Sequence, residues 1–252
     1  MRRRTASKGV SDTSVTIDMF GGSEEDATVL GAEGHRTRMR ARLLGAGPDA
    51  LADHEMLEML LFLALPRRDT KPIARELLAK FGGFGPVVSA SVGELRSVEG
   101  LGDAGIAALK LAQAAAARLL RGELLAKPVL ASWGALTDYL RAVLGYEKTE
   151  QFRVLFLDAR ARLIADEIMG RGTINHAPVY PREIARRALE LHALTVILAH
   201  NHPSGATEPS HDDIAMTREV RRALQPLGVG LHDHLIVTGA ACVSMRQLGL
   251  LV

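Results

Sequence analysis

The feature that most constrains the fold is a short apolar run that ends abruptly in histidine. Residues 194–199, LTVILA, are rich in β-branched side chains and have the length of a buried strand. Residues 200–205, HNHPSG, follow directly, and their proline and glycine predict a turn out of the strand. Ser210 is a favourable N-cap for a helix that extends to about Leu224. A buried strand that leads through a loop into a helix predicts an α/β domain.

The residues after this strand include the donors of a metal site. His200 and His202 point to the same side of an extended segment, because side chains alternate with a period of two. Asp213 lies in the first turn of the predicted helix, close enough to return to the two histidines. Imidazole and carboxylate donors suit Zn²⁺, and three protein ligands leave a fourth position for water, as in catalytic zinc sites. His211 and Asp212 compete with Asp213, since spacing alone does not eliminate them.

A catalytic zinc site also needs groups that move protons and stabilise charge. Bound zinc lowers the pKa of its water to about 7, but a carboxylate must shuttle the proton and a donor must stabilise the oxyanion. Glu150, directly before the first predicted strand of this domain, is the candidate base, and Ser210 is the candidate donor. Ser210-x-x-Asp213 also has the spacing of a helix capping box, a role that is compatible with metal binding.

Two further features involve metal-binding residue types. His232 and His234 form a second His-x-His pair, whose rings would lie on one face of a strand. No loop delivers a third ligand nearby, so we interpret them as packed histidines, with His234 as a candidate to support a ligand. Cys242 lies in an apolar strand without basic neighbours in sequence and is predicted to be a buried small hydrophobe, not a nucleophile.

The composition indicates a soluble cytoplasmic protein. The chain has 252 residues and a formal net charge of +2, which suits one large domain or two small ones without a strong charge signal. A single cysteine excludes an intramolecular disulfide and fits a reducing compartment. No apolar run approaches the roughly 20 residues that span a bilayer, and the early arginines precede no apolar segment of a secretory signal. We therefore expect no membrane partner.

The chain divides into a polar tail and two domains. Residues 1–33 lack apolar periodicity and are predicted to be a disordered tail. Residues 34–121 are predicted to be a small helical domain, which includes a helix with Asp53 as its N-cap. Residues 122–132 are the predicted linker, and residues 133–252 are predicted to form a mixed sheet flanked by helices. The strands that we predict in this sheet are residues 152–158, 163–169, 194–199, 229–231, 235–237 and 242–245.

The helical domain contains a Gly-hydrophobic-Gly turn. Gly100 and Gly102 separate a short helix from a long Ala/Leu-rich helix, as in the helix-hairpin-helix module of DNA-repair proteins. In that module a phosphate approaches the backbone N–H groups at the second helix, so the contact is independent of sequence. A tight turn between two packed helices explains the glycines as well. Asp103, which sits where a phosphate would approach, argues against DNA.

The whole run from His200 to Asp213 resembles the JAMM (MPN+) metalloprotease signature, His-x-His-Pro-x₈-Ser-x₂-Asp. More closely, the chain resembles the RadC family of bacterial DNA-repair proteins. Further matching residues are Glu150-Gln151-Phe152, Leu157-Asp158, Gly172-Thr173, Pro181-Arg182-Glu183-Ile184, Asp233-His234 and Val243-Ser244, and in the first domain Asp53-His54-Glu55, Phe81-Gly82 and the hairpin glycines. The resemblance covers roughly residues 34–252.

This resemblance implies a JAMM/MPN-like, cytidine-deaminase-like fold and a zinc-dependent hydrolase that cleaves amide or isopeptide bonds of a peptide or protein substrate. It implies His200, His202 and Asp213 as metal ligands and Ser210 as the residue that assists the tetrahedral intermediate. The family glutamate corresponds to Glu150, with Glu167 as the alternative. Two other functions stay open: a DNA-binding repair accessory with a structural or vestigial metal site, and a zinc nuclease, although two-metal sites usually need more carboxylates than this loop offers.

Overall fold

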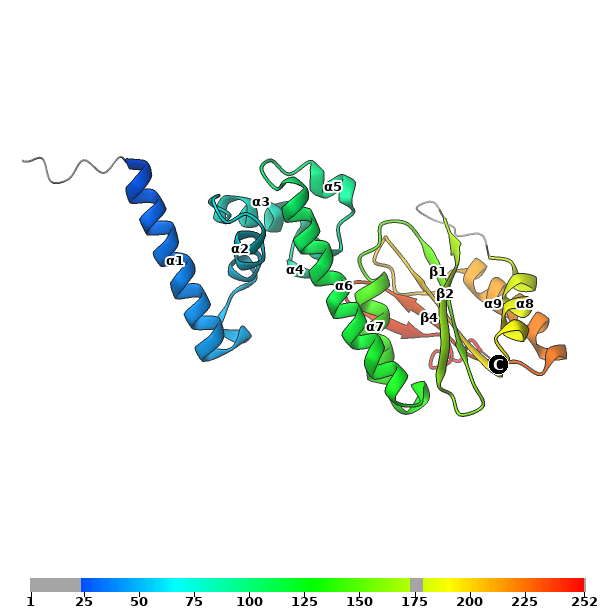
Figure 1. Cartoon of the computed structure of the whole chain (residues 1–252). Coiled ribbons are helices and arrows are strands. Elements are labelled where there is room, and N and C mark those ends of the chain that lie inside the picture. Colours follow the sequence, from blue (N-terminus) through cyan, green and yellow to red (C-terminus); the bar gives the residue numbers. More distant parts are fainter. Residues whose placement is uncertain (1–23, 173–178, 252) are drawn as a thin grey trace, which may run out of the picture. The chain divides into compact units, whose positions relative to one another are not determined.

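The computed structural model describes residues 24–172 and 179–251 (Figure 1). The described residues form two compact units, which divide between Ala50 and Leu51. In the first unit, helix α1 spans Glu24–Ala46 and the 3₁₀ helix η1 spans Pro48–Ala50. The sequence predicted a disordered tail up to residue 33, but α1 begins within that range, where apolar residues follow no helical period and so gave no signal. The rest of the predicted tail, residues 1–23, lies outside the described residues.

The second unit begins with a bundle of short helices that ends in one long helix. The bundle surrounds a helical core of buried residues, which includes Leu57, Leu61, Ile73, Leu77, Val87, Leu95, Leu101, Ile106 and Leu109. Gly82 ends α3 in the left-handed conformation that glycine favours, at φ 87°. The five helices are α2 (Asp53–Ala64), α3 (Lys71–Phe81), α4 (Phe84–Ser89), α5 (Val92–Arg96) and α6 (Gly102–Ala126).

Two helix boundaries differ from the prediction. The N-cap of α2 is Ala52 and not Asp53, because the Glu55 carboxylate accepts a hydrogen bond from the Ala52 backbone N–H at 3.1 Å. Helix α6 continues to Ala126, into the predicted linker 122–132. Its continuation has a physical cause: Leu124 is fully buried against the sheet domain, so this last turn contributes to a core.

The sheet domain is a mixed five-stranded sheet with the strand order β2-β1-β3-β4-β5. Strands β3 and β4 are parallel, and the other neighbours are antiparallel. The strands are β1 (Gln151–Leu157), β2 (Leu163–Arg171), β3 (Thr195–Asn201), β4 (Gly230–Val237) and β5 (Cys242–Ser244). The helices of this domain are α7 (Trp133–Leu144), α8 (Pro181–Glu190) and α9 (His211–Leu224), with the 3₁₀ helices η2 (Val129–Ala131) and η3 (Gln225–Leu227).

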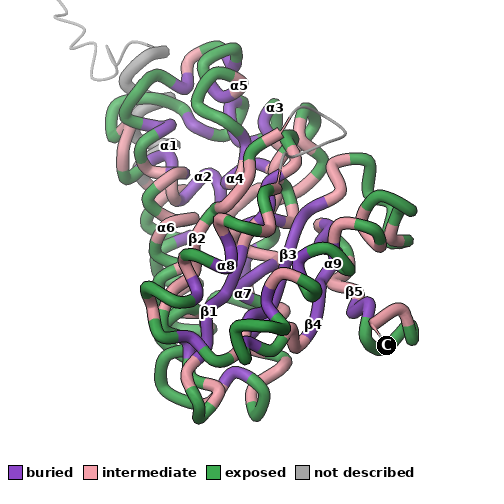
Figure 2. The backbone as a smooth tube through the Cα atoms, turned by 90° about the vertical axis from the view of Figure 1, so that its right-hand side faces the viewer, coloured by how far each residue is buried: buried purple, intermediate pink, exposed green. Residues whose placement is uncertain are grey.

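Helices cover both faces of the sheet, which confirms the predicted α/β architecture (Figure 1). One face packs on α7 through an α7-side core that includes Leu136, Leu140, Leu155, Ile197 and Leu235. The other face packs on α8 and α9 through an α8/α9-side core that includes Phe152, Ile184, Val196, Leu198 and Val220. Strands β1 and β3 are therefore buried along almost their whole length (Figure 2). Among the described helices, none is long and apolar enough to cross a membrane.

Strand β4 differs from its prediction in a way that matters for the site. The sequence predicted strands at 229–231 and 235–237, but β4 is continuous from Gly230 to Val237. The polar residues between them continue the pairing with β3, except that the register shifts between Leu231 and Asp233. His232 is the extra residue at this shift. Such a bulge reverses the alternation of side chains along a strand.

Candidate metal centre

Strand β3 delivers the first histidine of the site from inside the sheet. His200 is opposite Phe152 of β1 and Ile236 of β4, and its side chain is only 1% exposed. The Phe152 ring stacks on the His200 imidazole with centroids 6.0 Å apart. His202 lies just past the end of the strand, where its backbone N–H donates to the Val237 carbonyl at 3.1 Å. The sheet therefore fixes the backbone at both histidines.

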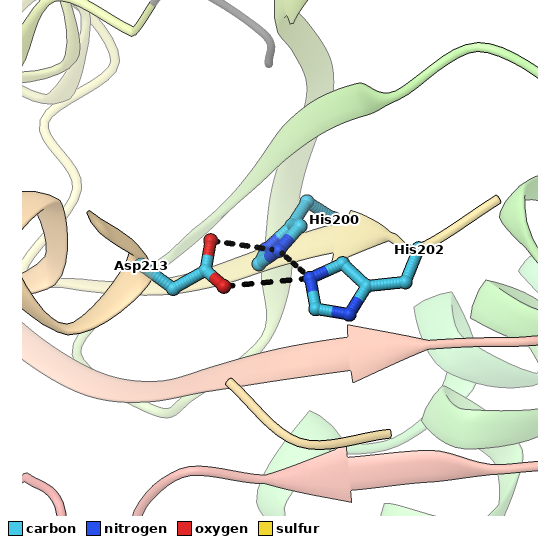
Figure 3. Close-up of side chains that lie close together, drawn as sticks. All are labelled: His200, His202 and Asp213. Carbon is cyan, nitrogen blue, oxygen red and sulfur yellow. Dashed lines mark hydrogen bonds and ion pairs between the residues drawn. The ribbon is translucent and has the colours of Figure 1, made fainter. Parts of the chain in front are cut away.

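Three side chains bring their donor atoms together at this point (Figure 3). Nε2 of His200 lies 2.9 Å from Nε2 of His202. Asp213 lies on the first turn of α9. Its Oδ1 is 3.0 Å from Nε2 of His200, and its Oδ2 is 3.4 Å from Nε2 of His202. The ligand atoms of a tetrahedral ion with bonds of about 2.0 Å are about 3.3 Å apart. The observed spacing fits this, so the cluster can hold a metal ion.

The hydrogen bond of His202 favours the same conclusion. Its Nδ1 lies 2.8 Å from the Ala206 carbonyl oxygen, which only accepts, so Nδ1 carries the ring proton. Nε2 then faces Nε2 of His200 and the Asp213 carboxylate with a lone pair. Lone pairs and negative charges that face each other at short range repel unless a cation lies among them. The donor set therefore has the chemistry of a cation site.

Helix α9 begins with the capping box that the sequence predicted. The Asp213 backbone N–H donates to Ser210 Oγ at 3.1 Å, and the Ser210 hydroxyl and backbone N–H both donate to the Asp213 carboxylate at 2.7 Å. Burial opposes ionisation of this carboxylate, but its close contacts with the His200 and His202 rings hold the pKa of Asp213 well below its usual range. One carboxylate thus joins the helix cap to the histidine pair.

Glu150 lies at the end of the sheet that carries the histidines. The adjacent Asp213 carboxylate raises the pKa of His202, and the charge of Glu150 adds to this effect although burial of the ring opposes it. Asn201, between the two histidines, holds the loop of Glu150. Its side-chain oxygen accepts from the Gln151 backbone N–H at 2.8 Å, and its NH₂ donates to the carbonyls of Glu147 and Thr149 at 2.9 and 3.2 Å. The structure thus links the candidate base to the metal loop.

Glu167, the alternative base, lies on β2 in a different environment. The Arg187 guanidinium of α8 donates to both of its carboxylate oxygens, at 2.6 to 3.0 Å. An arginine that forms a two-pronged pair with a carboxylate fixes its position and occupies both of its oxygens. Glu167 therefore has a structural partner in the described chain.

The competing ligands and the cysteine lie outside the cluster. His211 and Asp212 are exposed, and among the described residues the cluster comprises His200, His202 and Asp213 alone. Cys242 is partly buried, and this burial raises the pKa of its thiol to about 12, which disfavours the nucleophilic thiolate.

The rings of His232 and His234 do not lie on one face of β4, so the prediction that they share a face was wrong. His232 packs edge-on against Trp133 of α7, with ring centroids 6.0 Å apart. His234 is fully buried on the opposite face, 5.6 Å from the Phe152 ring and in contact with His200. The bulge at His232 separates the rings, and no periodic pattern in the sequence reveals such a bulge.

Two side chains that the sequence argument missed contribute to this environment. Thr217 is buried and contacts His234, and Asn201 is buried beneath the Glu150 loop. A signal existed for Thr217, since it lies four residues after Asp213 and so on the same face of α9. Asn201 gave no signal, because its partners are backbone atoms some fifty residues earlier in the chain.

The hairpin glycines adopt the conformations that such a turn requires. Gly100 and Gly102 have φ of 79° and 58°. The Arg68 guanidinium covers Gly100, donating to its carbonyl at 3.0 Å, and a Cβ at this position would meet that guanidinium at 2.8 Å. Asp103 pairs with Arg96 at 3.5 Å on the surface. Close side-chain packing accounts for the glycine at 100.

The mixed sheet with flanking helices, and a His-His-Asp cluster at the end of a central strand, define a JAB/MPN-like domain. Residues 130–250 match the RadC-like JAB domain model, and residues 34–107 match the UPF0758 N-terminal model. The chain is 52% identical to a UPF0758 protein of Rhodobacter capsulatus over 213 residues, which cover 84% of this chain and 100% of that relative. It is 49% identical to a UPF0758 protein of Ruegeria pomeroyi over 217 residues, with 86% and 97% covered. The chain belongs to the UPF0758 family, which confirms the resemblance to RadC proteins.

Proposed function

We propose that the protein is a zinc-dependent metallopeptidase that hydrolyses amide or isopeptide bonds of a peptide or protein substrate. The observation that carries the proposal is the convergence of His200, His202 and Asp213 at the end of β3. Two imidazoles and one carboxylate are a ligand set of catalytic zinc sites, which keep an open position. The RadC-like JAB domain of this chain is consistent with a metallohydrolase.

Each residue around the cluster has a role on this proposal. Zinc held by His200, His202 and Asp213 would lower the pKa of a bound water to about 7 and so supply a nucleophile for a carbonyl near neutrality. Glu150 takes a proton from the attacking water and passes it to the leaving amine. Ser210 turns its hydroxyl from the Asp213 carboxylate, 2.7 Å away, toward the developing oxyanion. Asn201 keeps the Glu150 loop in place during both transfers.

The test uses the zinc-loaded full chain and a complex peptide library that contains isopeptide-linked members. New amine termini are identified by mass spectrometry. Wild type is expected to create them, whereas Glu150→Gln lowers the rate by at least about a hundredfold and retains its zinc. Glu167→Gln is the matched control, because this residue is paired with Arg187, and it keeps activity within about threefold. A zinc-loaded wild type that cleaves nothing, or an equally active Glu150→Gln, contradicts the proposal.

A second candidate function is sequence-independent DNA binding by the helical region. It is favoured by the left-handed conformations of Gly100, before α6, and Gly102, the first residue of α6, and by the exposed Arg68 at the same turn. This function predicts binding to unrelated DNA sequences that weakens as salt rises. Replacing Gly100 and Gly102 by alanine should weaken it further. Absence of binding at low salt excludes this candidate without affecting the first.

A further inference from the structure

We infer that His234 and Thr217 are positioning residues that fix which ring nitrogen of His200 carries its proton. The inference rests on the proposed metal site and deepens it. Nδ1 of His200 lies 2.8 Å from Nε2 of His234, and Nδ1 of His234 lies 2.6 Å from Oγ1 of Thr217. The Thr217 hydroxyl lies 2.5 Å from the backbone carbonyl oxygen of Asp213. These side chains form a continuous buried relay between two of the three ligands, and each is at most 1% exposed.

The direction of every hydrogen bond in the relay follows from its last member. A carbonyl oxygen only accepts, so the single hydroxyl hydrogen of Thr217 is donated in a hydrogen bond to the Asp213 backbone carbonyl. The Met245 sulfur, 3.8 Å from the hydroxyl, is a weak acceptor and does not compete. The Thr217 oxygen must then accept a hydrogen bond from the Nδ1–H of His234. Thr217 therefore determines the proton position on the next ring.

The proton position on His234 determines that on His200. In this relay the buried His234 ring is neutral and has a single N–H, so that one of its nitrogens donates and the other accepts. Since Nδ1 of His234 carries that proton, its Nε2 accepts from Nδ1 of His200. The remaining nitrogen of His200, Nε2, then turns a lone pair toward His202 and Asp213. This is the form of the ring that binds a metal ion through Nε2.

The fold supplies the relay from three separate elements. Thr217 lies one helical turn after Asp213 on α9, where a hydroxyl reaches the carbonyl four residues earlier. His234 lies on β4, parallel to β3, and the bulge at His232 directs its ring to the face that carries His200. The Phe152 ring packs against both imidazoles, at 6.0 and 5.6 Å between centroids, and so limits ring rotation. A ligand from the strand and a ligand from the helix are thus coupled through β4.

His202 reaches the same protonation pattern by a simpler route. Its Nδ1 donates directly to the Ala206 carbonyl at 2.8 Å in a partly exposed loop. A backbone carbonyl cannot be removed by substitution, whereas the relay of His200 consists of side chains. The two ligands therefore allow a test in which one orientation is perturbed and the other is unchanged.

The first measurement is zinc affinity by competition with a chromophoric chelator. Thr217→Val removes the acceptor of the His234 proton without changing side-chain shape, and we expect about a 10- to 100-fold weaker affinity. Thr217→Ser keeps the hydroxyl and should remain within about threefold of wild type. Thr70→Val is the matched control, because Thr70 is also buried and donates to a backbone carbonyl, but in the helical region. It should leave zinc affinity unchanged. A folded Thr217→Val with wild-type affinity overturns the inference.

The second measurement is nitrogen-15 NMR of the histidine rings of the wild-type chain, which needs no folded variant, and its readout at His234 needs no bound metal. The relay predicts that His234 is protonated on Nδ1 and unprotonated on Nε2, and that His200 in the zinc-loaded chain is protonated on Nδ1. A proton on Nε2 of His234 overturns the relay. If wild type binds no zinc, the proposed function fails, but the His234 spectrum still decides for or against the relay.

Discussion

The chain contains two His-x-His segments on neighbouring parallel strands, and the strands place the histidine rings of the two segments differently. His200 and His202 straddle the end of β3, so the second ring can turn back toward the first. His232 and His234 lie inside β4, and a bulge places their rings on opposite faces of the sheet. The same spacing therefore gives two candidate metal ligands at the end of β3, whereas in β4 it gives one ring that contacts His200 and one ring that packs on Trp133. Strand ends and bulges decide the outcome, not spacing.

The central residue of each segment shows a similar contrast. Asn201 is buried and binds the loop that carries Glu150. Asp233 is buried and accepts hydrogen bonds from the Ser244 hydroxyl and from the Arg246 backbone N–H at 3.0 Å. The first side chain thus organises a loop of the site, whereas the second stabilises the end of the sheet. Each segment is tied to a different part of the domain.

The largest expected difference between the segments concerns metal content. His202→Ala removes one of three ligands, so the purified protein should lose its roughly one equivalent of zinc. His232→Ala, the matched control in the second segment, should retain it. Elemental analysis of both variants after gel filtration measures this difference. Equal zinc content in the two variants would contradict the claim that only the first segment binds zinc.

A smaller difference is expected in stability. His234→Ala leaves a cavity in a fully buried position and removes the partner of Thr217, at an expected cost of about 2–4 kcal/mol in the free energy of unfolding. His232→Ala, at a partly exposed position, should cost about 1 kcal/mol or less. Urea unfolding of the chelator-treated proteins measures both values. A larger loss for His232→Ala would contradict the assignment of the two faces.

The smallest effect is the pH dependence of His232. Burial, and then the nearby Arg246 guanidinium, lower the pKa of this ring below its ordinary value of 6.5. As pH drops below 6.5, the unfolded chain takes up a proton on this ring before the folded chain does. The free energy of unfolding therefore decreases as pH drops from 6.5 to the pKa of the folded chain. His232→Gln should flatten this slope by less than about 1.4 kcal/mol per pH unit, because the ring is partly exposed. An unchanged slope between pH 7 and 5 would show that the ring is not perturbed.

The sequence alone predicted the parts of the fold that depend on local patterns. The apolar run 194–199 predicted β3, and Ser210 predicted the start of α9, because both signals lie within a few residues. The family resemblance then identified Asp213 among three neighbouring candidates. The bulge in β4, the relay through Thr217 and the loop held by Asn201 were missed, because each depends on contacts between distant segments. The extension of α6 was missed for the same reason, since Leu124 packs on a core formed by later residues.

The central claim is that His200, His202 and Asp213 hold one zinc ion while the second histidine pair does not. A crystal structure of the zinc-loaded full chain, with anomalous scattering measured at the zinc edge, tests it directly. We predict one anomalous peak bound by Nε2 of both histidines and by the Asp213 carboxylate, and none at His232. A zinc-saturated crystal with no peak at these three residues, or with its peak elsewhere, would contradict the account.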